Sequence, residues 1–313
     1  MAKKKENEIL DLPGVGPATA QKLMENGYTE LKQIATAPIG DIMELCDMTE
    51  LTAKKVIKFA QDKLEMGFKG ADIIEESRHN IFHIPIGCKA FDEMMAGGIE
   101  SGSITEAYGE FGSKKTQIAH QLAVNIQLEP LKGIAVYLDS EGSFRPSRIR
   151  QMAKAKGLDE EAILKGIKYA RAFNSDHQVI LAEKIENMIV EEKLPIRLVI
   201  VDSLTSAFRS EYVGRGMLAD RQQKINKHMV TLKKLADMYN IAVYVTNQVS
   251  VDPAQMFGDP TKAIGGHIVG HASTHRIYLR KGKKGSGVAK LIDSPNLPDS
   301  ESIFNVVEGG IVD

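Results

Sequence analysis

One segment of the sequence has the residue types and spacing of a loop that binds phosphate. Gly109-Glu110-Phe111-Gly112-Ser113-Lys114-Lys115-Thr116 follows an apolar run and precedes an amphipathic one. Between a strand and a helix, such a loop cradles phosphates with backbone N–H groups, while its lysine reaches the β and γ oxygens and its hydroxyl binds Mg²⁺. Lys115 and Thr116 fit these two roles. The residues that we expect to contact a nucleotide are Gly109, Glu110, Phe111, Gly112, Ser113, Lys114, Lys115, Thr116 and Gln117.

The segment departs from the phosphate-binding motif at one position. Lys114 stands where the motif has glycine. A turn rich in serine and lysine at the start of a helix is also a common structural feature. Taken alone, the segment therefore leaves both interpretations open.

Two acidic residues at predicted strand ends favour the nucleotide site. The apolar run 197–203 contains Asp202, which would hold Mg²⁺ through water. Glu141 follows the apolar run 135–139, at the strand edge where open α/β sheets bind ligands, and it could orient or deprotonate an attacking water. Buried strands often end in Asp by chance, and Glu141 could cap a helix. Three such signals in one sheet make coincidence the weaker explanation.

The phosphate-loop segment and the two acidic residues can meet only if their strands lie side by side in one sheet. From Ile81 onward, short apolar runs alternate with amphipathic ones, which is typical of a mostly parallel α/β sheet. After residue 272 only strands are predicted, with a tight turn at 284–287. The predicted strands are Ser103–Tyr108, Ile134–Asp139, Ile167–Arg171, Leu198–Asp202, Ile241–Thr246, His275–Arg280, Val288–Asp293 and Ser302–Val307, with helices near 116–128, 147–156, 175–192 and 219–239.

The chain of 313 residues is long enough for a large domain and a smaller one. We expect a helical domain over residues 1–67, with helices around Leu31–Ile34 and Ala53–Leu64. A linker over residues 68–80 would join it to a core domain over residues 81–313.

The helical domain contains a candidate DNA-binding turn. Leu12-Pro13-Gly14-Val15-Gly16-Pro17 precedes an amphipathic run and has the pattern of a helix-hairpin-helix. Gly14 and Gly16 let the turn approach a phosphate, whose oxygens meet the N–H groups of the following helix. Such binding would be independent of DNA sequence. A purely structural helical hairpin is the alternative.

Charge and cysteine content limit the possible partners and cellular compartment of the protein. The net charge is −1, so DNA binding must come from local patches, such as residues 276–290, which contain six basic and no acidic side chains. Cys46 and Cys88 lack metal-ligand spacing and suit a reducing cytosol. No run is apolar and long enough to span a bilayer, and the start of the chain lacks the apolar stretch of a signal peptide. We expect a cytoplasmic, nucleoid-associated protein without membrane contact.

The sequence as a whole resembles the archaeal RadA recombinases, relatives of the eukaryotic strand-exchange proteins and of bacterial RecA. The resemblance covers nearly the whole chain in family order. It implies an α/β fold with a RecA-type ATPase core, a mostly parallel sheet, and a small all-α helix-hairpin-helix domain before it. The similar segments are Glu106–Ser113, Glu141–Pro146, Ala172–Asp176, Asp202–Thr205, Thr246–Val249 and Ile264–His267.

The resemblance also assigns roles around the nucleotide. It implies an ATPase that uses ATP and Mg²⁺, with Lys115 on the phosphates and Glu141 polarising water. Gln248 would sense the γ-phosphate and signal to a DNA-binding loop. Arg148 would stack on adenine, and a cap that includes Asp293 and Pro295 would close over ATP from a neighbouring protomer. From the residues alone, a buried amide, a surface arginine and a proline turn remain the alternatives.

Two loops after core strands are expected to grip DNA. The loop 209–221 contains Arg209, Arg215 and Arg221, and the loop 250–270 contains Gly265 and Gly266. A loop of about twenty residues is usually functional or disordered. The family resemblance implies that both loops bind DNA inside a filament, through backbone amides and arginines at phosphates. A disordered surface insert is the alternative for the second loop.

The linker holds a candidate self-assembly motif. Phe68 and Ala71 form a Phe-x-x-Ala pattern, and an exposed apolar pair is unusual unless something buries it. In the family this pair enters a pocket on the adjacent protomer, for which 170–188 is the matching segment. A repeated contact that does not close gives a helical filament. Phe68 could instead pack on its own domain.

The resulting hypothesis is a DNA-dependent ATPase that assembles on single strands and exchanges them with homologous duplex. Its partners would be single- and double-stranded DNA and further copies of itself, and recombination mediators are possible additional partners. Lys114 favours an alternative, a regulatory paralogue of the same fold with weak or no ATP turnover. A hexameric helicase fits the core but not the Phe-x-x-Ala linker.

Overall fold

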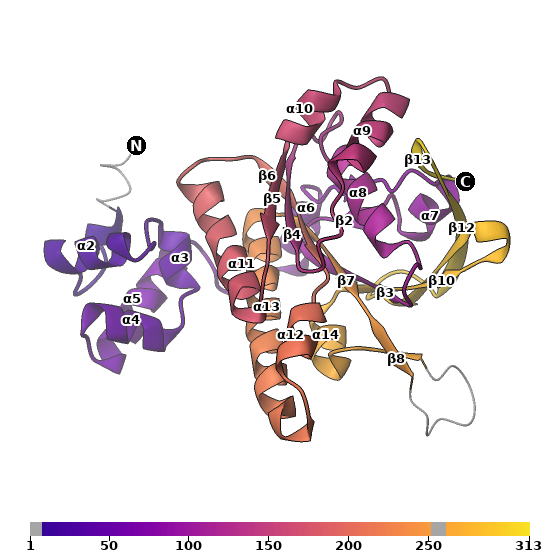
Figure 1. The fold of residues 1–313 in the computed structure, drawn as a ribbon. Coiled ribbons are helices and arrows are strands. Elements are labelled where there is room, and N and C mark those ends of the chain that lie inside the picture. The colour runs from indigo at the N-terminus through magenta and orange to yellow at the C-terminus, as the bar shows by residue number, and fades with distance from the viewer. Residues whose placement is uncertain (1–7, 252–260) are drawn as a thin grey trace. The chain divides into compact units, whose positions relative to one another are not determined.

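The computed structural model describes residues 8–251 and 261–313. These form two compact units, the first ending at His79 and the second beginning at Asn80 (Figure 1). Each unit has its own hydrophobic core.

Helices are the only regular structure in the described part of the N-terminal unit. Leu23, Ile34, Ile42 and Val56 from successive helices meet in its core, each with no exposed surface. The predicted helices near residues 31 and 53 are confirmed, whereas α4 was not predicted because its apolar residues are interrupted by Gly40 and Asp41. The helices are α2 (Pro17–Glu25), α3 (Leu31–Ala35), α4 (Ile39–Cys46), α5 (Glu50–Lys63) and α6 (Ala71–Arg78).

Helix α6 lies within the segment 68–80 that was expected to be a linker. Its first turn carries Asp72 and its last turn carries Arg78, which complements the helix dipole at both ends. None of its residues is buried. Ala71 is its first residue, and Phe68 just before it is fully exposed. The helix therefore forms from local sequence preferences without help from a packed core.

The second unit is built on a nine-stranded sheet with the order β13-β12-β11-β10-β3-β7-β6-β4-β5. The five strands from β3 to β5 in this order, together with β10, run parallel, and β10 to β13 are antiparallel. All eight predicted strands are present, so the mostly parallel α/β fold is confirmed. The strands are β3 (Ser103–Gly109), β4 (Ile134–Asp139), β5 (Ile167–Arg171), β6 (Ile196–Asp202), β7 (Ala242–Asn247), β10 (His275–Lys281), β11 (Gly287–Asp293), β12 (Ser300–Val307) and β13 (Gly310–Val312).

Helices cover both faces of this sheet (Figure 1). One apolar cluster joins α7, α8 and α9 to one face, and another joins α11 and α13 to the opposite face. Strands buried on both faces require the nearly continuous apolar runs seen in β4 and β6. The helices are α7 (Lys89–Met94), α8 (Lys115–Asn125), α9 (Pro146–Ala155), α10 (Glu160–Lys165), α11 (Ser175–Val190), α12 (Ser206–Glu211), α13 (Leu218–Tyr239) and α14 (Gly266–Ala272), with short strands β1 (His83–Ile84) and β2 (Ile99–Glu100).

The two expected DNA loops are shorter than predicted. In the first, α12 extends to Glu211 and α13 begins at Leu218, with one 3-10 turn between them. In the second, β8 (Val249–Val251) pairs with β9 (Thr261–Ala263), and α14 follows. Residues 261–270 of the expected loop 250–270 are therefore mostly in regular structure, and Asn247 anchors the returning chain by donating to the Ile264 carbonyl at 2.6 Å. Residues 252–260 lie outside the described residues.

Candidate nucleotide-binding site

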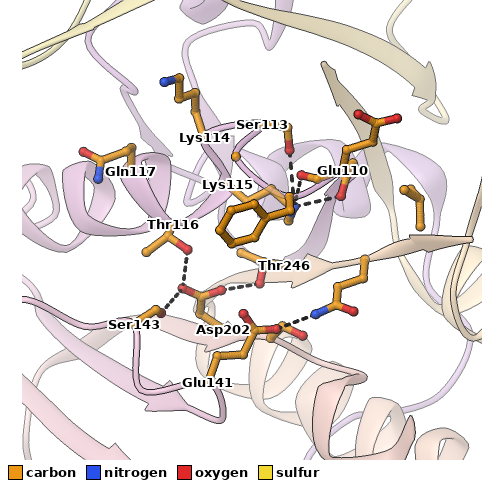
Figure 2. Close-up of a pocket in the computed structure, with 16 residues that line it drawn as sticks. Glu110, Ser113, Lys114, Lys115, Thr116, Gln117, Glu141, Ser143, Asp202 and Thr246 are labelled. Atoms are coloured by element: carbon orange, nitrogen blue, oxygen red, sulfur yellow. Dashed lines mark hydrogen bonds between the residues drawn. The ribbon is translucent and has the colours of Figure 1, made fainter. Parts of the chain in front are cut away.

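A pocket of about 540 Å³ opens where the parallel strands end at the phosphate-loop segment 109–116 (Figure 2). β3 ends at Gly109, and α8 begins at Lys115. At Gly109 a β-carbon would lie 2.0 Å from the Leu279 carbonyl oxygen, so the close approach of β10 requires glycine. The pocket has the size of a typical small-molecule site. Every residue of 109–117 that the sequence predicted lines it.

Lys115 lies inside the loop that it belongs to. Its ammonium donates to the carbonyls of Gly109 at 2.8 Å and Glu110 at 2.9 Å, and to the Ser113 hydroxyl at 3.2 Å. Burial lowers the pKa of Lys115, an effect that the carboxylates of Asp202 and Glu141 oppose. The structure thus places a partly desolvated cation at the base of the phosphate loop.

Lys114 has the backbone conformation that the motif reserves for glycine. It caps α8 with φ +77° and ψ 10°, in the left-handed region. A residue with a β-carbon incurs a steric penalty there. Its side chain points away from Asp202 and Glu141 (Figure 2). Lys114 therefore retains the loop geometry of the motif with a less suitable residue type.

Four hydroxyl groups converge on Asp202 at the end of β6. Its Oδ2 accepts hydrogen bonds from Thr116 at 2.9 Å, Tyr137 at 2.8 Å and Ser143 at 3.0 Å, and its Oδ1 accepts one from Thr246 at 2.5 Å. Asp202 is 2% exposed, so these donors replace the water that a buried carboxylate loses. The two residues expected to hold Mg²⁺, Thr116 and Asp202, are therefore in direct contact.

The oxygen donors at this point suit a magnesium ion. Mg²⁺ prefers hard oxygen ligands and is usually held by one or two protein groups together with substrate phosphates. The Thr116 hydroxyl and the Asp202 carboxylate meet at 2.9 Å beside the phosphate loop. The residues present therefore fit the metal.

Glu141 and Gln248 both line the pocket and contact each other. The Gln248 amide donates to Glu141 Oε1 at 2.8 Å. Gln248 stands between β7 and β8, at the base of the hairpin that leads to residues 252–260. Both residues were predicted as parts of the site, but their direct contact was not. This contact joins the candidate base for water to a segment expected to bind DNA.

The sequence did not identify Tyr137, Ser143 and Thr246 as parts of the site. Tyr137 and Thr246 lie within buried strands, and both are polar residues in apolar runs. That interruption is the signal that could have found them, because a buried hydroxyl needs a partner.

Arg148 lies at the rim and does not line the pocket. Its guanidinium donates to Gln117 Oε1 at 2.8 Å and to the carbonyls of Val307 and Glu308. Asp293 and Pro295 are exposed at and after the end of β11, and the structure does not bring them to this pocket.

The candidate DNA-binding residues fall in two places. Gly14 has φ +82° in the turn before α2, and Gly16 caps that helix. In the second unit the others follow β6 and β7 along the chain. Arg209 is exposed on α12, Arg215 begins the 3-10 turn, Arg221 is on α13, and Gly265 and Gly266 start α14 with positive φ.

Two structural facts bear on the wider class of protein. Cys46 and Cys88 are both buried with free thiols. Among the described residues, no helix combines the length and apolar character that crossing a membrane requires.

Two family models and several curated relatives match this chain. A family model described as Rad51 matches residues 77–313, and one described as a SAM-like helix-hairpin-helix tandem matches residues 6–62. The DNA repair and recombination protein RadA of Methanococcus maripaludis strain C7 is 49% identical over 319 residues, covering 97% of this chain and 99% of the relative. The protein of the same name from Methanococcus voltae is 49% identical over 322 residues, covering 98% and 99%. The chain therefore belongs to the Rad51 family, among relatives that are RadA recombinases.

Proposed function

We propose that this protein is an ATP-dependent recombinase that assembles on single-stranded DNA and exchanges it with a homologous duplex. The observation that carries the proposal is the Glu141–Gln248 contact, because it links a nucleotide pocket to the hairpin expected at DNA. The names of the RadA relatives, which describe DNA repair and recombination, support it.

The arrangement of the pocket supports the hydrolysis of ATP. Lys115 would leave its loop carbonyls to meet the β and γ oxygens of ATP. Glu141 would orient a water in line with the γ-phosphorus and accept its proton. Thr116 and Asp202 would hold Mg²⁺, which when bound neutralises the charge that develops on the phosphates. Gln248 would lie close enough to the γ-phosphate to report its loss to the hairpin β8–β9.

Assembly and DNA binding belong to the same proposal. Phe68 is fully exposed, so it is available to enter a pocket on another copy. Gly14 and Gly16 would bring backbone N–H groups to duplex phosphates, while Arg209, Arg221 and the segment around Gly265 would contact DNA in the assembly. Arg148, Asp293 and Pro295 would complete the adenine site and its cap across a protomer contact.

The comparisons do not favour the alternative of a regulatory protein of the same fold, because relatives that match nearly the whole chain are named DNA repair and recombination proteins. Lys114 at φ +77° bears on the rate of turnover instead, since strain in the phosphate loop would act against productive alignment of ATP. We propose that the nucleotide still binds and that hydrolysis is slow relative to a glycine-containing loop.

Electron microscopy with ATP and single-stranded DNA, followed by a strand-exchange assay, tests the proposal. We expect helical filaments and exchange with the native chain, and neither with Lys115→Ala as the matched control. Closed hexamers would favour a helicase. Monomers that bind ATP without exchange would favour the regulatory protein.

A further inference from the structure

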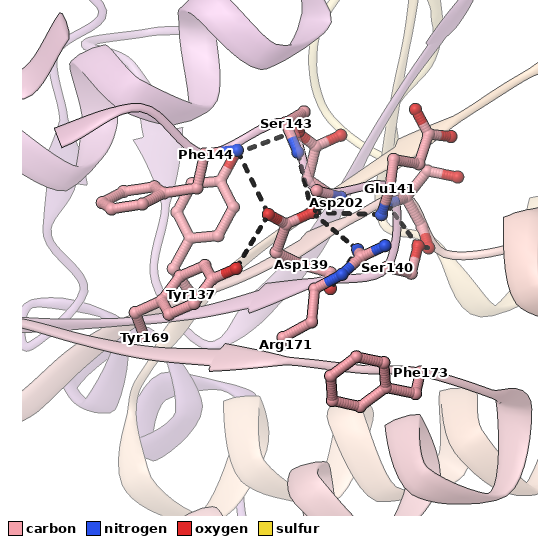
Figure 3. Close-up of polar contacts among 12 residues, drawn as sticks. Tyr137, Asp139, Ser140, Glu141, Ser143, Phe144, Tyr169, Arg171, Phe173 and Asp202 are labelled. Carbon is pink, nitrogen blue, oxygen red and sulfur yellow. Dashed lines mark hydrogen bonds and ion pairs between the residues drawn. The ribbon is translucent and has the colours of Figure 1, made fainter. Parts of the chain in front are cut away.

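One buried carboxylate holds the turn that carries Glu141. Asp139 ends β4 and has no exposed surface. Its Oδ1 accepts the N–H groups of Glu141 at 3.0 Å, Gly142 at 2.6 Å and Ser143 at 3.1 Å, and its Oδ2 accepts that of Phe144 at 3.1 Å. Four consecutive backbone donors therefore converge on one side chain (Figure 3).

Two side chains from the neighbouring strand β5 hold this carboxylate from the other side. The Tyr169 hydroxyl donates to Oδ2 at 3.2 Å. Arg171 donates to Oδ1 at 3.3 Å and to the Asp139 main-chain oxygen at 2.9 Å. A buried carboxylate without such donors would be costly, and an ionised carboxylate can only accept. All six partners of the Asp139 carboxylate are hydrogen-bond donors, and one of them, Arg171, is also positively charged.

The rest of the turn is fixed around the same point. The Phe144 ring stacks on Tyr169 with centroids 5.0 Å apart and on His120 at 5.4 Å. Gly142 has φ +71°, and a β-carbon there would lie 3.4 Å from the Arg171 guanidinium. Glu141 differs from these residues, because its side chain is exposed and bonds to Gln248. The direction of the Glu141 side chain is therefore set through its backbone.

We infer that Asp139 is a positioning residue for ATP hydrolysis. It fixes the backbone of Glu141 so that the glutamate reaches the attacking water, and it does so without lining the nucleotide pocket itself. The inference rests on the proposed role of Glu141. A displacement of about 1 Å in a reacting group can lower a rate roughly 100-fold.

Asp139→Asn tests this directly, because the amide keeps the shape but replaces one acceptor with a donor. We expect kcat for ATP hydrolysis to fall about 10-fold or more while the affinity for ATP stays within about twofold. Asp92→Asn is the matched control. Asp92 is a partly buried aspartate that accepts the N–H groups of Ile86 at 2.6 Å and Gly87 at 3.1 Å, outside the nucleotide pocket. Its kcat should equal that of the native chain.

The decisive readout is the coupling between Asp139 and Glu141. In a Glu141→Gln background, Asp139→Asn should cause little further loss, because the group that it positions has already lost its function. Equal losses in both backgrounds, a fall in ATP affinity that accounts for the whole effect, or an unchanged kcat would overturn the inference.

Tyr169→Phe gives a second, milder variant if Asp139→Asn does not fold. It removes one donor to the same carboxylate, so a smaller loss in kcat is expected, again absent in the Glu141→Gln background. An unchanged kcat would then count against Asp139. If Glu141→Gln itself hydrolysed ATP at the native rate, the proposed function of Glu141 would fail instead.

Discussion

Lys114→Gly should both stabilise the protein and speed hydrolysis. Lys114 has φ +77°, where a residue with a β-carbon is disfavoured by about 1–2 kcal/mol. Glycine removes that penalty but loses roughly 0.5–1 kcal/mol more conformational entropy on folding. The free energy of unfolding should therefore rise by about 0.5–1 kcal/mol.

The effect of Lys114→Gly on the rate of hydrolysis depends on whether the strain is relieved in the ground state or only in the transition state. If about 1 kcal/mol is recovered only in the transition state, kcat rises about fivefold, since each 1.36 kcal/mol is a factor of ten. Loss of the Lys114 charge removes an attraction for the triphosphate that need not be stronger in the transition state. We therefore expect KM for ATP to rise together with kcat.

The assay compares ATP hydrolysis with and without single-stranded DNA, beside chemical unfolding. Lys284→Gly is the control, because Lys284 is an exposed lysine at φ +54° outside the nucleotide pocket. It should show a similar gain in unfolding free energy with an unchanged rate in the absence of DNA. Equal rates for the native chain and Lys114→Gly, or a slower variant, would refute the strain argument and show that the loop tolerates lysine.

Three further predictions concern the nucleotide, assembly and DNA. Lys115→Ala should abolish ATP binding in a fluorescent-nucleotide titration, whereas Glu141→Gln should bind ATP normally and hydrolyse it slowly; equal ATP affinity in the native chain and Lys115→Ala would contradict the site. Phe68→Glu places an unpaired charge where an apolar pocket is expected, so light scattering should detect a smaller species; native-size assemblies would remove Phe68 from the contact. Single-strand binding should weaken as salt rises, and shortening residues 252–260 should reduce strand exchange more than ATP binding; an unaffected exchange rate would exclude that segment.

The sheet and the phosphate loop could be predicted because their signals are local. The apolar run that became β6 stays buried on both faces, so its composition alone identifies it. Residues 109–116 combine turn residues with a following amphipathic pattern, and both ends of the loop agree with the structure. In each case neighbouring residues carry enough information to define the conformation.

The features that were missed depend on contacts between distant segments. α14 begins at Gly265 and Gly266, whose residue type favours a loop. It is fixed by the buried side chain of Val269 and by the hydrogen bond from Asn247 to the Ile264 carbonyl. Tyr137 looked like an ordinary core residue, and only the register of β4 against β6 brings its hydroxyl to Asp202. The periodicity of apolar residues in the sequence does not indicate which side chains from distant segments will meet.

That register also explains why two buried carboxylates can stand side by side. Asp139 of β4 pairs directly with Asp202 of β6. Like charges at neighbouring positions disfavour folding unless each is neutralised by its own donors. Four backbone N–H groups, Arg171 and one hydroxyl, that of Tyr169, surround Asp139, whereas among the described residues only hydroxyl groups donate to the Asp202 side chain.

The two donor sets differ in what they can release. Each hydroxyl can turn its O–H away from Asp202 when a cation arrives, because the hydrogen is free to rotate and the oxygen can then act as an acceptor. The backbone N–H groups around Asp139 cannot turn away without unfolding the turn. A carboxylate with rotatable donors is suited to a metal that comes and goes with the nucleotide. A carboxylate that is hydrogen-bonded to backbone N–H groups is suited to holding Glu141 in one place while the metal and the nucleotide exchange.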